Sequence, residues 1–284
     1  MGITRESLKF LYHCKEHGVD FESTCQIGRQ CCFFSCNECG IKYCDFAEPL
    51  FRFLGAKSVD SIDYSDYEGA SIIHDMNQPI SDEMKSKYSL VIDCGTLEHV
   101  FDYPTAIKNC MQMVKQGGHF IAVTPANNFF GHGFYQFSPE LFYSLLSEQN
   151  SFTETQILTQ DDLLRWYKIR EPKTVKGRVN VSCAKNTTCS LYVVSKKISD
   201  VPDKLTVLQS DYIETWTWNE KNIQAEITKV SIKKFIKKII PERIINNLKE
   251  YRKVIFAERV EGRKIVTVGK KRFYERIKLK GMKV

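Results

Sequence analysis

Two histidines and a tyrosine lie where a folded chain could use them to move protons. His99 follows the apolar stretch 88–95, and His132 and Tyr135 lie in the segment 127–140 that follows the next one. Because imidazole titrates near neutral pH, we take His132 as the first candidate base and His99 as the second, with Tyr135 as a further catalytic candidate. Two alternatives stay open: His99 could orient its loop through hydrogen bonds, and His132 could stabilise its own loop.

Small and polar residues also follow the predicted strands. Gly28 follows one apolar stretch, Asp63 and Asp75 end two others, and Cys94, Gly95 and Thr96 follow a fourth. In an open parallel sheet, ligands bind beyond the carboxyl ends of the strands. These residues are therefore candidates for a binding site, although a strand-terminal aspartate is also a common helix cap or turn residue.

The elements that would position these side chains alternate along the chain. Predicted strands cover 25–27, 57–65, 70–75, 88–95 and 119–125. Predicted helices cover 4–17, 45–56, 105–118 and 138–149. Such alternation implies parallel crossovers and helices on both faces of the sheet. Two later strands, 151–159 and 189–197, should close the sheet with one of them antiparallel, and the insert 161–188 should cover the site.

The segment 88–125 resembles the class I S-adenosylmethionine-dependent methyltransferases. In that family a strand enters an L-E-H-V-x-D turn, and a helix ending in K-P-G-G leads to a strand ending in T-P. The matching residues here are Leu97, Glu98, His99, Val100 and Asp102, then Lys115, Gln116, Gly117 and Gly118, then Thr124 and Pro125. With its flanking strands the resemblance covers about 20–198. It implies a Rossmann-like α/β fold, doubly wound and mostly parallel, with an antiparallel edge strand.

The resemblance also implies S-adenosylmethionine as the cofactor. Asp63 would accept hydrogen bonds from the ribose hydroxyls, because one carboxylate can bind both. Asp75 and Met76 would lie beside the adenine, while Cys94–Thr96 would meet the methionine end and the substrate. A cap role for Asp75 remains an alternative.

The cofactor loop departs from the family pattern. Where the family has G-x-G-x-G, this chain has QIGRQCCFFSCNECG, in which only Gly28 is in place and Arg29 and Gln30 follow it. Arg29 could pair with the cofactor's carboxylate and Gln30 could hydrogen-bond it. Alternatively, Arg29 could fill the pocket and leave a catalytically inactive binding or assembly protein.

The same loop is rich in cysteine. It holds Cys31, Cys32, Cys36, Cys39 and Cys44, and the C-x-x-C at 36–39 has the reach for a tetrahedral zinc site. No second C-x-x-C follows at a knuckle spacing, so buried thiols without a metal are the favoured interpretation and zinc is the alternative.

Charge divides the chain into two parts. Residues 229–284 hold 19 Lys and Arg against 5 Asp and Glu, a net charge of +14, so 1–228 carry −7 of the total +7. Apolar and basic residues alternate at helical spacing after Val230, which predicts an amphipathic helix over 230–253 on an anionic membrane surface. Docking of this helix on the acidic body is the alternative. A nucleic-acid partner is disfavoured, because no such motif is present.

The predicted organisation is an N-terminal helix (1–20), a methyltransferase domain (21–198), a linker (199–228) and a basic helical extension (229–284). No apolar run reaches the roughly 20 residues that span a bilayer, and no signal peptide is recognisable, so we expect a cytoplasmic protein, peripheral at the membrane's inner face. The expected substrate is a hydroxyl of a sugar or surface-glycan precursor. The aromatic loop 134–137, Trp166 and the membrane-seeking tail favour it.

Overall fold

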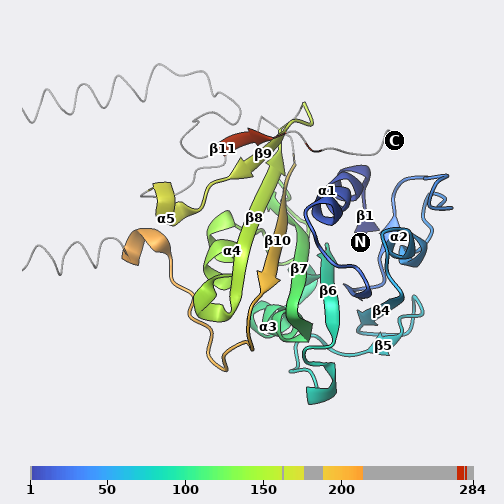
Figure 1. Ribbon diagram of the computed structural model, residues 1–284, viewed down its shortest axis with the longest axis horizontal. Helices are drawn as coiled ribbons and strands as arrows, with labels where there is room; N and C mark the ends of the chain where they lie inside the picture. The colour runs from blue at the N-terminus through green and yellow to red at the C-terminus, as the bar shows by residue number, and fades with distance from the viewer. Residues whose placement is uncertain (1, 162, 176–187, 214–273, 278, 280–284) are drawn as a thin grey trace, which may run out of the picture.

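In the described part of the chain, nine strands form one central sheet (Figure 1). The computed structural model describes residues 2–161, 163–175, 188–213, 274–277 and 279. The strand order is β11-β9-β8-β10-β7-β6-β2-β4-β5. In chain order the strands are β2 (Ser23–Ile27), β4 (Ser58–Asp63), β5 (Ile72–Ile73), β6 (Tyr88–Cys94), β7 (Val114–Asn127), β8 (Phe152–Gln160), β9 (Trp166–Ile169), β10 (Cys189–Lys197) and β11 (Tyr274–Ile277).

Strands β7, β6, β2, β4 and β5 form the parallel half of the sheet. From β2 the chain moves outward to β4 and β5, and it then returns to add β6 and β7 on the other side of β2. The order therefore reverses between β2 and β6, which is the switch point where such sheets bind ligands. The predicted doubly wound α/β class is confirmed.

The antiparallel strand lies inside the sheet and not at its edge as the sequence suggested. β10 pairs antiparallel with both β7 and β8, and β9 and β11 continue the antiparallel half outward. Both faces of β10 are covered, since Leu191 and Val193 are fully buried on one face and Tyr192 and Val194 pack on the other. The predicted pair of closing strands is present as β8 and β10.

Helices cover both faces of the sheet. α3 (Tyr103–Met113) and α4 (Pro139–Leu145) pack on one face, and α1 (Arg5–Glu16) and α2 (Glu48–Phe53) pack on the other. Because side chains alternate along a strand, Val91 of β6 joins the first core while its neighbours join the second. Figure 1 shows α1 and α2 together on one side of the sheet.

Side-chain caps begin three of the helices. Thr4 Oγ1 accepts from the Ser7 N–H at 3.2 Å, and Asp102 Oδ1 accepts from the Thr105 N–H at 3.2 Å. Ser138 caps α4, with Pro139 at its first position, as the sequence predicted. α3 ends at Met113 and β7 begins at once, so Gly117 and Gly118 lie in the strand and not at the helix end.

The N-terminal segment packs on the sheet. β1 (Gly2–Ile3) pairs in parallel with β3 (Cys31–Cys32), and a Cβ on Gly2 would collide with the Cys31 carbonyl oxygen. α1 buries Leu8, Phe10 and Leu11 in the core it shares with β6 and β10. The N-terminus is thereby held beside the loop that follows β2. The predicted boundaries at 20, 198 and 228 stay predictions.

Two predicted features lie partly or wholly outside the described residues. The amphipathic helix over 230–253 is outside them, while 274–277 of the predicted helical extension form the strand β11. The insert 161–188 carries β9 and the short α5 (Pro172–Val175), and its residues 176–187 are outside the described set. Within the described residues, no helix combines the length and apolar character needed to cross a membrane.

Candidate functional site

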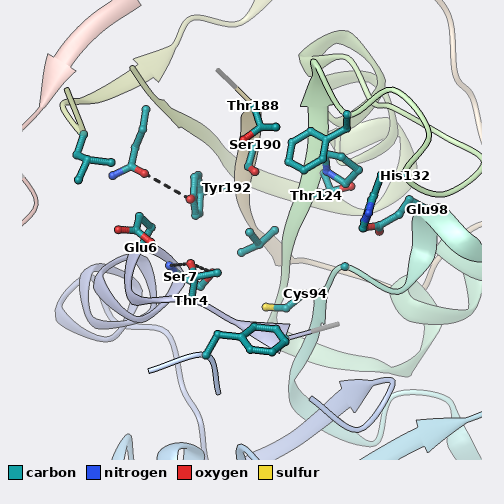
Figure 2. A pocket seen from close by; sticks show the side chains of 18 of the residues that line it. Thr4, Glu6, Ser7, Cys94, Glu98, Thr124, His132, Thr188, Ser190 and Tyr192 are labelled. Atoms are coloured by element: carbon teal, nitrogen blue, oxygen red, sulfur yellow. Dashed lines mark hydrogen bonds and ion pairs between the residues drawn. The ribbon is translucent and has the colours of Figure 1, made fainter. Parts of the chain in front are cut away.

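A cavity of about 910 Å³ opens at the carboxyl ends of β6, β7 and β8. The strand ends supply Cys94, Gly95, Thr124 and Gln160 to its wall. Facing them are residues of the N-terminal segment and of β10, which Figure 2 shows as Thr4, Glu6, Ser7, Ser190 and Tyr192. The cavity lies next to the switch point, so its place in the sheet is that of a ligand site.

Gly28 and Thr96 make close contact where β2 and β6 end. Gly28 has φ +70°, and a Cβ there would lie 2.6 Å from Thr96 Oγ1. Thr96 Oγ1 donates to the Ile27 carbonyl oxygen at 2.7 Å. This position therefore requires glycine for both its conformation and its contact. Gly95, with φ +91°, lines the cavity beside it.

Asp93 organises the turn that follows β6. Its carboxyl group is buried, and Oδ1 accepts from the N–H groups of Thr96 at 2.9 Å and Leu97 at 3.3 Å. Burial, reinforced by the nearby Glu98, raises the pKa of Asp93 well above its usual range. The turn then continues as a short 3-10 helix, Leu97–His99.

Glu98, His99 and His132 converge at one side of the cavity. His132 Nε2 lies 3.5 Å from Glu98 Oε1, and the rings of His99 and His132 are 5.0 Å apart between centroids. All three residues line the cavity. Burial raises the pKa of Glu98, whereas partial burial and the neighbouring His132 lower the pKa of His99. The structure thus brings the two predicted bases together, beside a buried carboxylate.

Tyr135 is turned away from this cluster. Its hydroxyl donates to the Phe101 carbonyl oxygen at 2.6 Å, and its ring packs on Tyr103 and Phe137. It does not line the cavity. The contacts of Tyr135 are those of a residue that fixes the loop, so its predicted catalytic role is not supported by the geometry.

Arg29 is bound by the protein itself. Its Nε donates to Glu48 Oε1 at 2.8 Å and one terminal nitrogen donates to the Glu68 carbonyl oxygen at 2.6 Å. Its guanidinium also lies 3.8 Å from the centroid of the Phe46 ring. Arg29 thereby ties the loop after β2 to the loop after β4. It lies outside the cavity, which does not suit its predicted pairing with a cofactor carboxylate.

Gln30 folds back onto the strand ends. It is fully buried, and its Nε2 donates to the Ile27 carbonyl oxygen at 2.5 Å and to Thr96 Oγ1 at 3.3 Å. Its Oε1 is buried without a hydrogen-bond partner in the described structure. Gln30 therefore fills the space beside Gly28 that the family's second glycine would leave open.

The predicted adenosine residues lie at the ends of β4 and β5. Asp63 is half-buried, and its Oδ1 accepts from the Tyr64 N–H at 2.7 Å. Asp75 accepts from both the backbone and the side-chain nitrogen of Asn77, which lowers its pKa and matches the turn role left open for it. Met76 is buried in the core against α3. None of the three lines the cavity.

The cysteine-rich loop brings two thiols together. Cys36 Sγ and Cys39 Sγ are 2.6 Å apart, and both side chains are buried. Cys32 is buried nearby, whereas Cys44 is exposed. Among the described residues, no third Cys, His, Asp or Glu ligand atom joins the pair closely enough to form a metal-binding group.

Sequence reasoning did not identify the N-terminal wall of the cavity or its far end. Thr4 is the N-cap of α1, Glu6 and Ser7 lie in its first turn, and Asp161 follows β8. Thr124, known from the T-P motif, has a buried hydroxyl without a partner among the described residues. Trp166, expected near the substrate, is instead buried against Tyr192 with 4.7 Å between ring centroids. Local patterns carry no signal for these long-range contacts.

No family profile and no curated protein matches the chain. Comparison with solved structures found several methyltransferases among the matches. The N-methyltransferase NodS from Bradyrhizobium japonicum, in complex with S-adenosyl-L-homocysteine, is 15% identical over 68% of this chain and 85% of its own, with a TM-score of 0.37. A SAM-dependent methyltransferase from Thermotoga maritima is 14% identical (68% and 90% covered, TM-score 0.38). The YcgJ protein from Bacillus subtilis is 9% identical (67% and 98% covered, TM-score 0.38). Identity this low leaves the activity of this chain to be proposed from its own residues.

Proposed function

We propose that this protein is an S-adenosylmethionine-dependent methyltransferase. The observation that carries the proposal is the position of the cavity. It lies at the carboxyl ends of β6 and β7, beside the β2/β6 switch point. Glu98 and His99, from the turn that carries the family resemblance, form part of its wall. The cofactor's methionine end would lie at Gly95, with its ribose toward Asp63.

The reaction needs alignment and a proton acceptor. The acceptor oxygen attacks the methyl carbon, the new O–C bond forms, and the S–C bond breaks with its electron pair passing to sulfur. A hydroxyl acceptor also loses its proton, which the Glu98 and His132 pair can take up. Holding both reactants in one closed site supplies much of the rate increase.

The proposed acceptor is a hydroxyl of a sugar or a surface-glycan precursor. Hydroxyl and carboxyl groups of Thr4, Glu6, Ser7 and Ser190 line the cavity and suit a polyhydroxylated molecule. Two lining phenylalanines, Phe33 and Phe129, offer flat apolar faces for a ring. Methyl incorporation from labelled S-adenosylmethionine into sugar nucleotides and cell-surface glycans tests this choice, and incorporation into protein alone contradicts it.

A second candidate function is a non-catalytic binding protein of the same fold. Arg29 and Gln30 favour it, because their side chains are held by Glu48, the Glu68 carbonyl and Ile27 at the place where the family keeps bare glycine backbone. If this packing excludes the cofactor, the cavity would bind another molecule without reaction.

Calorimetry on the full chain separates the two candidates. We expect S-adenosylmethionine and S-adenosylhomocysteine to bind, and Asp63→Ala to weaken both by about 1.5 to 3 kcal/mol through loss of a charged hydrogen-bond partner. Asp66→Ala, an exposed carboxylate in the same loop, is the matched control and should leave the affinity unchanged. Absence of binding at millimolar concentration would instead favour the non-catalytic protein.

A further inference from the structure

Three metal-ligand side chains meet at the cavity wall from two neighbouring strand ends. Glu98 and His99 follow β6, and His132 lies in the loop after β7. One ligand atom from each residue lies within 4.8 Å of the other two. The group brings together one carboxylate and two imidazoles, and Figure 2 shows Glu98 and His132 side by side near Thr124. An ion placed among the three would face the cavity, which they line.

One carboxyl oxygen of Glu98 is buried without a partner in the described structure. The Glu98 side chain is only 1% exposed, and its Oε2 is buried with no hydrogen-bond partner among the described residues. Neither lysine nor arginine occurs among the described residues that line the cavity, whereas Glu6 adds a further carboxyl group. The carboxylate of Asp161, which also lines the cavity, is already paired with Arg165. A buried carboxylate is costly unless a positive charge or a donor compensates it.

The backbone holds the group in place before any ligand arrives. The Glu98 carbonyl oxygen accepts from the N–H groups of Phe134 at 2.7 Å and Tyr135 at 3.3 Å, so the loop of His132 is tied to the turn of Glu98. Gly133 has φ +68°, and a Cβ there would lie 2.9 Å from the Glu98 carbonyl oxygen. The close approach of the two loops therefore depends on glycine beside His132.

We propose that Glu98, His99 and His132 bind one divalent transition-metal ion at the wall of the cavity. Two imidazoles and one carboxylate form a ligand set of catalytic zinc and of other first-row transition metals, while magnesium and calcium prefer oxygen ligands. Three protein ligands leave coordination positions free on the cavity side. Those positions would bind water or an oxygen of the substrate.

The role of the ion in catalysis rests on the proposed methyl transfer. A bound cation lowers the pKa of a coordinated hydroxyl, so the acceptor would lose its proton to water in the cavity and attack as an alkoxide. With the ion bound, Glu98, His99 and His132 act as its ligands, and water replaces the Glu98–His132 pair as the proton acceptor. A metal at this site would restrict the acceptor to molecules whose reacting hydroxyl can bind the ion. A second oxygen on a neighbouring atom of the acceptor would complete the coordination of the ion.

Cobalt(II) is a suitable probe, because its visible absorption reports imidazole and carboxylate coordination without cofactor or substrate. His13 in the last turn of α1 and His17 at its C-cap, with ring centroids 4.0 Å apart, are a second place where cobalt could bind. The titration is therefore done on the full chain carrying His17→Ala. We expect one equivalent of Co²⁺ to bind, to be displaced by Zn²⁺, and to stabilise the chain against heat.

Separate variants test the assignment of each ligand. Glu98→Gln and His132→Ala should each weaken Co²⁺ about 100-fold, since loss of even an outer contact costs 10- to 100-fold. Glu6→Gln, a carboxylate of the same cavity outside the group, should keep the affinity. His132 is 49% exposed, so its variant should fold even if the Glu98 variant does not, as circular dichroism would show.

No Co²⁺ binding to the His17→Ala chain, or equal binding by the His132→Ala chain, would overturn the proposal. These measurements need no S-adenosylmethionine, so a failure of the metal site is distinct from a failure of the proposed activity. If the metal binds and the cofactor does not, the proposed metal site is supported and the proposed methyl transfer is contradicted. If both bind, chelation should remove methyl transfer and leave cofactor affinity intact.

Discussion

The turn after β6 should depend on the two hydrogen bonds that Asp93 accepts. Asp93 is 1% exposed, and its Oδ1 binds the Thr96 N–H at 2.9 Å and the Leu97 N–H at 3.3 Å. Asp93→Ala removes the acceptor and leaves both donors without it. The change is small in volume, so the main effect is on this turn and on Glu98, which follows it.

The loss of stability in Asp93→Ala comes from the two backbone N–H groups that lose their acceptor. A buried donor without a partner costs about 1 to 3 kcal/mol, and the longer bond to Leu97 is the weaker of the two, so Asp93→Ala should lower the free energy of unfolding by about 2 to 4 kcal/mol. Asp93→Asn keeps an oxygen acceptor. Because burial already raises the pKa of Asp93 and favours its neutral form, the amide should cost about 1 kcal/mol or less.

Urea denaturation followed by circular dichroism measures both variants against the parent chain. The calorimetric titration with S-adenosylmethionine should follow the same order, with Asp93→Ala weakest, since Gly95 and Thr96 lie in the disturbed turn. The reasoning is refuted if Asp93→Ala is as stable as the parent, because the two bonds would then contribute nothing. It is also refuted if Asp93→Asn is as damaging as Asp93→Ala, which would make the charge and not the acceptor decisive.

Three further predictions concern other parts of the chain. The buried Lys197 donates to the Val114 carbonyl oxygen at 2.6 Å, so Lys197→Met should lower the free energy of unfolding by about 1.5 to 3 kcal/mol, measured in urea. Burial lowers the pKa of His119 in the folded chain, so between the two pKa values the unfolded chain binds one more proton than the folded chain. The free energy of unfolding should therefore fall as the pH drops below about 6.5. His119→Leu should reduce the difference between urea melts at pH 7.5 and pH 5.5. If 230–253 form a membrane-surface helix, the full chain should co-sediment with anionic vesicles at low salt and less at high salt. The double variant Phe235→Ser with Ile239→Ser, which keeps β11 in the chain, should bind less even at low salt, and equal binding by it would contradict the membrane-surface helix.

Elements set by short-range patterns were predictable from the sequence. The β6 strand is apolar at most positions, and Ser138 with Pro139 favours the start of a helix, because a cap and a fixed φ act within one turn. The order of strands and helices then limited the chain to a doubly wound sheet. It also predicted that strand ends would carry the site, which is where the cavity opens.

Contacts between distant residues were decided only by the tertiary structure. The sequence places Arg29 in the predicted cofactor loop. In the structure its guanidinium donates to Glu48 and to the Glu68 carbonyl oxygen, because the loops after β2 and β4 pack against each other. Tyr135 lies three residues from His132, yet its hydroxyl is committed to the Phe101 carbonyl and does not reach the cavity.

The grouping of Glu98 with His132 shows the same limit most clearly. The two residues are 34 positions apart, and neither local spacing nor composition relates them. They meet because β6 and β7 are parallel neighbours in register, so that the loops at their carboxyl ends lie against each other and share the Glu98 carbonyl as an acceptor. The sequence determined which residues stand at each strand end. The order of the strands and the packing of the loops decided which of these residues could bind the same ligand. Both depend on contacts between residues far apart in the sequence, which local patterns do not predict.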